Sequence, residues 1–270
     1  MKGIIGIIMK AFILSDLHLE PKFLTEAFYI DKLKRRFSIQ AMNVLRESDV
    51  VIISGDVVEN GIIRSSENPL DALYKIFKKE VIFCLGNHEF AYQRHSDVIK
   101  YWSQWKHPNV HCLDVEGHVL YNNVNFVGNV LWYDFTLNKN QLLMKGEILD
   151  GWLDKTIEDF DPLKECEKCK KQIIENCSKD HKNVLVTHMV PHVDLNTFSK
   201  EQPQSQYNAY SGCERFLLDI QDQGYDIEYA ICGHTHRREC KEIWNIKCVN
   251  IGNDYYFRSG MISYMSIDID

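Results

Sequence analysis

The stretch Val50-Val51-Ile52-Ile53-Ser54-Gly55-Asp56 decides the fold of this 270-residue chain. Its apolar run is too short for a helix and is typical of a strand that is buried on both faces. The run ends at a glycine, and a carboxylate follows at once. We therefore predict a buried strand that carries Asp56 to a functional site at its carboxyl end.

The same pattern occurs four more times along the chain. Apolar runs at residues 11–15, 81–85, 184–187 and 229–232 each lead directly to side chains that commonly bind metals. These side chains are, in chain order, Asp16, His18, Asn87, His88, His188, His234 and His236. In sheets whose strands are connected by helices, ligands bind outside the carboxyl ends of the strands. We therefore expect all five strand ends to meet at one site.

The segments between these runs indicate one domain over residues 1–270 that mixes helices with parallel and antiparallel strands. Helical patterns at residues 24–47 and 69–79 connect the first three strands, which favours parallel pairing. Short strands follow between residues 110 and 127, with a hairpin turn at Asn122-Asn123. Residues 138–182 are mostly charged and predict a helical insertion that overhangs the site. Residues 1–8 precede the first strand, and we expect them to be a short N-terminal extension from an upstream translation start.

Composition limits the partners and the compartment. The net charge of −7 gives no general attraction to nucleic acid, so nucleic acid is not an expected partner. The sequence contains no apolar run of the roughly 20 residues that a membrane-spanning helix needs. The nine cysteines are spread through apolar runs and favour a reducing compartment, by default the cytoplasm. Nothing in the sequence specifies an oligomeric state.

The sequence contains two further candidates for metal binding, a cysteine-rich cluster and a single histidine. Cys166, Cys169, Cys177 and His181 offer four zinc ligands by type, but on a helix these positions form one core-facing stripe. Their spacing also misses the usual zinc-finger form, so a zinc site there is not expected. Among the other histidines, only His192 is a further candidate, because it follows His188 by four residues.

The ligand types at the strand ends predict a centre with two metal ions. Residues at i and i+2 of an extended segment face the same way, so Asp16 pairs with His18, and His234 pairs with His236. A mixed set of carboxylate, imidazole and amide donors suits Mn²⁺, Fe or Zn²⁺. Two adjacent cations need a shared anion, and Asp56 on the central strand is the expected bridge. Manganese is the expected metal, with iron or zinc as alternatives.

The order of these blocks resembles the calcineurin-like metallophosphoesterase superfamily. The five blocks are Asp16-Leu17-His18, Gly55-Asp56, Gly86-Asn87-His88-Glu89, His188, and Gly233-His234-Thr235-His236. The resemblance spans residues 10–252. It implies a two-sheet sandwich flanked by helices in four layers, αββα, with a dinuclear centre at the carboxyl ends of the strands.

The resemblance also implies a role for each site residue. One metal is expected to bind Asp16, His18, Asp56 and His236, and the other Asp56, Asn87, His188 and His234. His88 is expected to act beside the centre as an acid or a phosphate contact. Family members that act on phosphoproteins carry Asp-Arg-Gly shortly after the bridging aspartate, whereas this chain has Glu59-Asn60-Gly61. Glu59 can replace the carboxylate, and we expect it to hold His88, but the arginine is missing.

The chain is therefore more similar to the small bacterial-type phosphoesterases. We expect a hydrolase that cleaves phosphomonoesters or phosphodiesters of small phosphorylated substrates by metal-activated hydroxide. Two alternatives remain open. One is a non-catalytic binding scaffold, which intact ligand positions argue against, and the other is a nuclease, which would need a basic track beside the site.

Overall fold

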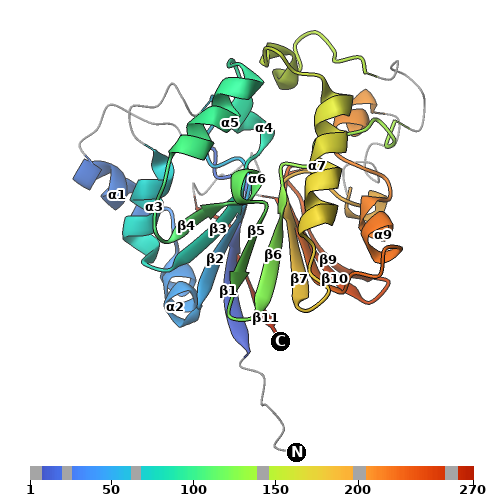
Figure 1. The fold of residues 1–270 in the computed structure, drawn as a ribbon. Helices are drawn as coiled ribbons and strands as arrows, with labels where there is room; N and C mark the ends of the chain where they lie inside the picture. The colour runs from blue at the N-terminus through green and yellow to red at the C-terminus, as the bar shows by residue number, and fades with distance from the viewer. Residues whose placement is uncertain (1–7, 20–25, 62–67, 139–145, 197–204, 253–260) are drawn as a thin grey trace, which may run out of the picture.

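The computed structural model describes residues 8–19, 26–61, 68–138, 146–196, 205–252 and 261–270. Two β-sheets lie face to face in the centre, and helices cover both outer faces (Figure 1). The first sheet has the strand order β11-β1-β2-β3-β4, and the second has the order β5-β6-β7-β8-β10-β9. This is the four-layer αββα sandwich that the sequence predicts.

The strands of the first sheet are β1 (Met9–Leu14), β2 (Val50–Ser54), β3 (Glu80–Cys84), β4 (Val110–Cys112) and β11 (Met265–Ile269). Those of the second are β5 (His118–Tyr121), β6 (Val124–Asn129), β7 (Lys182–Thr187), β8 (Ile227–Cys232), β9 (Arg238–Ile243) and β10 (Ile246–Ile251). Four strands are parallel in each sheet, namely β1 to β4 and β6, β7, β8 and β10. Among the described strands, β11, β5 and β9 pair in the antiparallel direction, and each lies at a sheet edge.

Alternate side chains of each central strand enter two different layers of the core. In β1, Ala11 and Ile13 face the second sheet, whereas Phe12 and Leu14 face the helices. This period of two is the pleat of a strand, and burial on both faces explains the unbroken apolar runs. The strands that carry the site are therefore fixed from both sides.

The helices are α1 (Glu26–Arg35), α2 (Ile39–Glu47), α3 (Pro69–Phe77), α4 (Asn87–Phe90), α5 (His95–Gln104), α6 (Leu113–Glu116), α7 (Pro162–Asn176) and α9 (Phe216–Gln221). Three short 3₁₀ turns add η1 (Leu153–Thr156), η2 (Val193–Leu195) and η3 (Gln206–Tyr210). Helices α1, α2, α3 and α5 lie on the side of the first sheet, and α7 and α9 lie on the side of the second (Figure 1).

The structure bears out two details of the chain path. The predicted helix over residues 24–47 is divided, because Ser38 caps the start of α2 with its side chain and its extended backbone interrupts the helix. Asn122 and Asn123 both have positive φ, 48° and 67°, as the two-residue turn between β5 and β6 requires.

The described part of the expected insertion at residues 138–182 contains the helix α7 and the η1 turn. Helix α7 packs on β6. Residues 139–145 lie outside the described residues, as do residues 1–7 of the expected extension. The insertion as a unit of its own therefore stays a prediction.

Candidate metal centre

Five of the predicted ligands occupy sharp turns at the ends of β1, β2 and β8. Asp16, His18, Asp56, His234 and His236 have φ values between 44° and 65°. Such left-handed conformations are uncommon for residues with a side chain and cost about 1–3 kcal/mol each. They allow the chain to leave the strand at once while the side chain points across the end of the sheet.

The turns are also fixed to one another. The backbone N–H groups of Asp16 and His18 donate to the carbonyl oxygens of Gly55 and Asp56, at 3.1 and 3.0 Å. The loop after β1 therefore follows the loop after β2, and their side chains reach the same space. The second sheet joins them because the N–H of His234, after β8, donates to Oδ1 of Asp16 at 3.2 Å.

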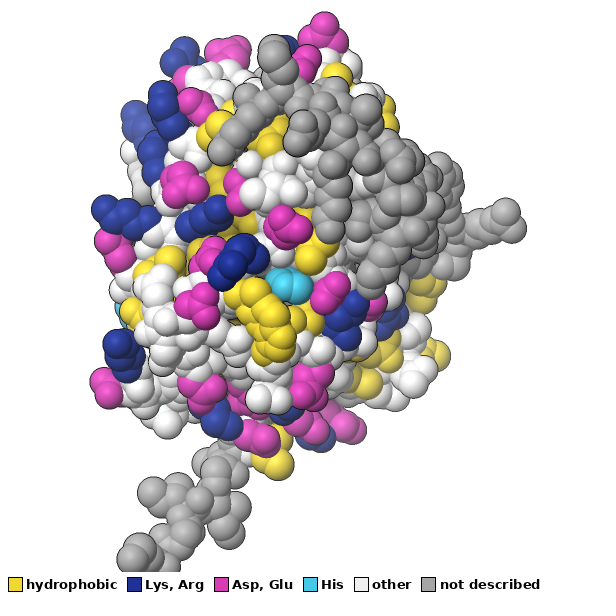
Figure 2. All heavy atoms as spheres, turned by 90° about the vertical axis from the view of Figure 1, so that its right-hand side faces the viewer, with side chains coloured by type: hydrophobic (Ala, Val, Ile, Leu, Met, Phe, Trp, Pro, Cys, Tyr) yellow, Lys and Arg dark blue, Asp and Glu magenta, His cyan; other side chains and the backbone are white. Residues whose placement is uncertain are grey.

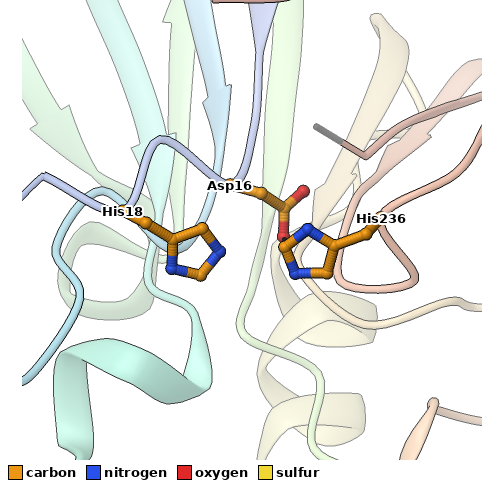
Figure 3. Close-up of side chains that lie close together, drawn as sticks. All are labelled: Asp16, His18 and His236. Atoms are coloured by element: carbon orange, nitrogen blue, oxygen red, sulfur yellow. Dashed lines mark ion pairs between the residues drawn. The ribbon is translucent and has the colours of Figure 1, made fainter. Parts of the chain in front are cut away.

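The first group of candidate ligands is Asp16, His18 and His236, whose ligand atoms lie within 4.8 Å of one another. Nε2 of His236 is 3.7 Å from Oδ1 of Asp16, and the rings of His18 and His236 stack at 5.1 Å. Figure 3 shows the three side chains turned toward a common space from the loops after β1 and β8. This group therefore takes ligands from both sheets.

The second group is Asp56, His188 and His234, with Asn87 beside it. Nε2 of His188 lies 3.2 Å from Oδ2 of Asp56 and 3.2 Å from Oδ1 of Asn87. Nδ1 of His234 is also 3.2 Å from Nε2 of His188. The donors again come from both sheets, and their nitrogen and oxygen atoms point at one another.

Asp56 lies between the two groups. Its Oδ2 is 3.2 Å from His188 and 3.9 Å from Nε2 of both His18 and His88. Burial opposes ionisation of Asp56, but the imidazoles of His188 and His88 outweigh it and hold the pKa of this carboxyl well below its usual value. A buried anion on which three imidazoles converge is the arrangement that a bridging ligand needs.

The outer nitrogens of three imidazoles are held by backbone carbonyl groups. Nδ1 of His188 lies 2.9 Å from the oxygen of Ser54, and Nε2 of His234 lies 3.1 Å from that of Tyr210. Nδ1 of His88 lies 2.6 Å from the oxygen of Glu59. A carbonyl can only accept, so each of these nitrogens carries a proton. Such contacts fix the tautomer and the ring direction of metal-binding histidines.

The surroundings shift the pKa values of two of these rings in opposite directions. Burial lowers the pKa of His188, but the adjacent Asp56 carboxylate more than offsets this and raises it to about 10. Burial and the neighbouring His188 lower the pKa of His234 to about 3, so its inward nitrogen keeps a lone pair.

Glu59 differs in detail from the sequence expectation. Its Oε2 lies 2.9 Å from Nδ1 of His18, whereas Oε1 is 4.0 Å from Nδ1 of His88. The carboxylate therefore contacts His18, and the backbone carbonyl of the same residue holds His88. Both contacts place Glu59 at the site.

Glycines and a buried glutamate shape the space around these ligands. A Cβ on Gly55 would overlap the ring of His188, and one on Gly86 would overlap the carboxylate of Asp56. Glu89 accepts from the N–H groups of Gly86, Asp56 and Val58, at 2.6, 3.1 and 2.9 Å, which ties two ligand loops together. Burial raises the pKa of Glu89 to about 8. The donor types and the close backbone approach both fit two small divalent cations.

Sequence reasoning missed one residue of the site, Asp154. It is fully buried, and its Oδ1 accepts from Nδ2 of Asn87 at 2.9 Å. Its Oδ2 accepts from Nε1 of Trp152, also at 2.9 Å. A carboxylate can only accept, so the amide nitrogen of Asn87 turns outward and Oδ1 turns toward the ligands. The sequence signal for Asp154 is weak: it consists of the Trp-x-Asp spacing, which allows the indole N–H to donate to the carboxylate two residues later.

A pocket of about 470 Å³ opens beside these ligands. One side is lined by the residues of the centre, among them Asp56 and His88, and by Arg237. The other side is lined by Gly151, Trp152, Leu153, Tyr207 and Ser211. A cavity of this size accommodates a small organic ligand beside the metal-binding side chains.

The remaining candidates lie elsewhere. His192 is buried against Trp244, with ring centroids 5.6 Å apart, and is not in the metal-binding groups of the described residues. Cys166 instead lies near Cys213, with sulfurs 3.6 Å apart, and near Asp134. Asp134 is already paired with Lys170 at 2.8 Å, so this group has its own cation.

Comparison with known proteins agrees with this geometry. The family model described as calcineurin-like phosphoesterase matches residues 9–238. The chain therefore belongs to the calcineurin-like phosphoesterase family, as its sequence blocks predict. Family members normally bind two divalent metal ions, and the two groups described above are the candidate ligands here. A search of curated proteins found no match.

Solved structures show the same fold. The chain resembles the phosphopantetheinyl hydrolase of Mycobacterium tuberculosis with 14% identity and a TM-score of 0.61, covering 97% of each chain. It also resembles a dimetal phosphatase from Danio rerio with 13% identity and a TM-score of 0.51, covering 96% of this chain and 91% of that one. At identities this low, the structural likeness establishes the fold alone. Among the described residues, no helix combines the length and apolar character needed to span a membrane.

Proposed function

We propose that this chain is a phosphoesterase that uses two divalent metal ions to hydrolyse small phosphorylated substrates, either monoesters or diesters. The observation that carries the proposal is the meeting of two ligand groups at Asp56, beside a pocket that His88 also lines. Family membership supports the reaction class, and the size of the pocket supports a small substrate.

The proposed ligands divide between two sites. Asp16, His18, Asp56 and His236 would hold one ion, and Asp56, Asn87, His188 and His234 the other. When bound, two such ions lower the pKa of water and neutralise phosphoryl oxygens. The mixed nitrogen and oxygen donors favour manganese, with iron or zinc as alternatives.

His88 is the proposed general acid. Its Nδ1 donates to the carbonyl oxygen of Glu59, so its Nε2 faces Asp56 and the pocket. In hydrolysis, water first loses one proton to the solvent, and the oxygen of the resulting hydroxide then forms a bond to phosphorus while the bond to the leaving oxygen breaks. A protonated His88 can then give its Nε2 proton to that oxygen. Glu59 supports this geometry through its carbonyl and holds His18 through its carboxylate.

A metal and substrate measurement tests the proposal. Purified protein should contain two equivalents of a first-row divalent metal by elemental analysis. It should hydrolyse at least one of nitrophenyl phosphate, bis-nitrophenyl phosphate and a cyclic nucleotide, and Asp56→Asn should remove most of the bound metal and most of the activity. Two bound ions without hydrolysis of any ester would favour the alternative of a non-catalytic scaffold.

A nuclease remains the other alternative, but the face shown in Figure 2 gives it no support. On the face shown in Figure 2, acidic and basic side chains are interspersed, without a continuous basic track among the described residues. The net charge of −7 points the same way.

All nine cysteines are free, which supports the proposal of a reducing, cytoplasmic location.

A further inference from the structure

The pocket beside the metal centre has a second side that hydrolysis alone does not require. Trp152 and Tyr207 line it, and the buried ring of Tyr210 stacks on Trp152. We call these three rings the aromatic wall. We propose that the substrate's leaving group carries a planar aromatic ring that packs on this wall. The inference rests on the proposed phosphoesterase function and adds the class of leaving group.

The three rings of the aromatic wall form a continuous stack. Trp152 lies between Tyr207 and Tyr210, with centroid distances of 5.2 and 5.0 Å and interplanar angles of 24° and 23°. Tyr210 closes the inner end, because it is fully buried, whereas Tyr207 is 44% exposed. Near-parallel aromatic rings at this spacing are favourable, and a further ring can add to the open end of a stack.

The aromatic wall is attached to the metal-binding side chains at two points. Trp152 donates from Nε1 to Asp154, which in turn accepts from the amide of Asn87. Tyr210 accepts the outer proton of His234 through its backbone carbonyl. The hydroxyl of Tyr210 also accepts from the N–H of Leu149 at 3.0 Å, which fixes the ring. The wall is therefore held at a set distance from the centre.

The chemistry of the pocket favours an aromatic group over a sugar or a bare phosphate. A volume of about 470 Å³ lies in the range of pockets for complete organic ligands, far above the needs of one phosphoryl group. Away from the metal-binding side chains, Gly151, Trp152 and Leu153 present mostly carbon atoms, whereas a sugar would need many hydrogen-bonding partners. Arg237 also lines the pocket and adds a positive charge that can attract an anionic phosphoryl group.

Two esters of the same alcohol isolate the contribution of the ring. Adenosine 5′-monophosphate and ribose 5-phosphate both leave through a primary ribose hydroxyl and differ by the base. Stacking of a base on an aromatic side chain is worth about 1–3 kcal/mol, so the adenine ester should be preferred about 5- to 150-fold in kcat/KM, mainly through KM. Tyr207→Leu should reduce this preference toward one.

The matched control is Trp244→Leu. Trp244 is an aromatic residue with a similar exposure, 52%, in the turn between β9 and β10, and it does not line the pocket. This variant should keep the full preference. A preference near one in the unmodified protein, or one that Tyr207→Leu leaves intact, would overturn the inference.

Calorimetric titration of the metal-loaded protein with both esters separates this inference from the proposed function. Tighter binding of the adenine ester that depends on Tyr207, without hydrolysis of any ester, would support the aromatic wall and reject the phosphoesterase. Hydrolysis of both esters with equal KM and equal affinity would support the phosphoesterase and reject the wall.

Discussion

The two sides of the pocket are built in different ways. The metal side consists of residues at the ends of β1, β2, β3, β7 and β8, placed by two regular sheets. The opposite side consists of rings from η3 and the segment before η1, placed by side-chain stacking and by the Asp154 hydrogen bonds. Parallel strands define where their ends lie, so the metal side follows from the fold. The aromatic wall depends on contacts between residues distant in sequence.

The largest expected effect is on the metal side, at Asp56. Asp56→Asn should remove most of both ions, because the bridging carboxylate is the one group proposed to contact both. Loss of several kcal/mol of charge stabilisation corresponds to a fall in kcat/KM of about 10³-fold or more. Elemental analysis beside kinetics checks this, with Asp16→Asn as the matched variant that affects one group. Full occupancy of both sites in Asp56→Asn would show that Asp56 is not the bridge.

His88→Ala should separate catalysis from metal binding on the same side. Both ions should remain, while kcat falls about 10²–10⁴-fold on esters with poor leaving groups, as general acid catalysis implies. Nitrophenyl esters should lose less, because nitrophenolate departs without a proton. Metal content and kcat on both ester types are the measurements. Equal losses on both would point to phosphate binding, and metal loss would make His88 a ligand.

Asp154→Ala tests whether the two sides are connected. Without its carboxylate, the amide of Asn87 has no fixed direction and can turn its N–H₂ toward the cations. Loss of such an outer contact typically costs about 10- to 100-fold in metal affinity or activity. Asp150→Ala is the control, because the side chain of Asp150 is 99% exposed in the same segment. Equal metal affinity in both variants would show that Asn87 is oriented without Asp154.

The smallest expected effect is that of Trp152→Phe. This change keeps an aromatic ring in the stack and removes the Nε1 donor to Asp154. One net hydrogen bond is worth about 0.5–1.5 kcal/mol, so metal affinity should fall a few-fold to about tenfold. Competition with a chelator of known affinity measures this. An unchanged metal affinity would show that the hydrogen bond from Trp152 to Asp154 does not influence the metal ligands.

These differences explain what the sequence could predict. Apolar runs followed at once by Asp16, Asp56 or His188 place a residue type at a known point of a known element, so the meeting of these candidate ligands at the strand ends was predictable. The sandwich itself followed from the family resemblance. Asp154 follows no apolar run, and its partner Asn87 is 67 residues away. Its role depends on tertiary packing that no local pattern encodes.

Glu59 illustrates the same limit on a smaller scale. Its position near His88 followed from the family resemblance, but the choice between two neighbouring imidazoles depends on side-chain rotamers. The carboxylate contacts His18, and the backbone contacts His88. Such a choice is fixed by the packed loops and not by the order of residues.

Both ligand groups draw from the two sheets at once: Asp16, His18, Asp56 and Asn87 extend from the first, and His188, His234 and His236 from the second. With the proposed ligands, each ion would cross-link the two sheets at the carboxyl ends of their strands. Binding to the folded state alone adds RT ln(1 + [L]/Kd) to the free energy of unfolding, about 2.7 kcal/mol at a hundredfold excess over Kd. The supply of metal in the cell would then govern how long the protein survives as well as how fast it works.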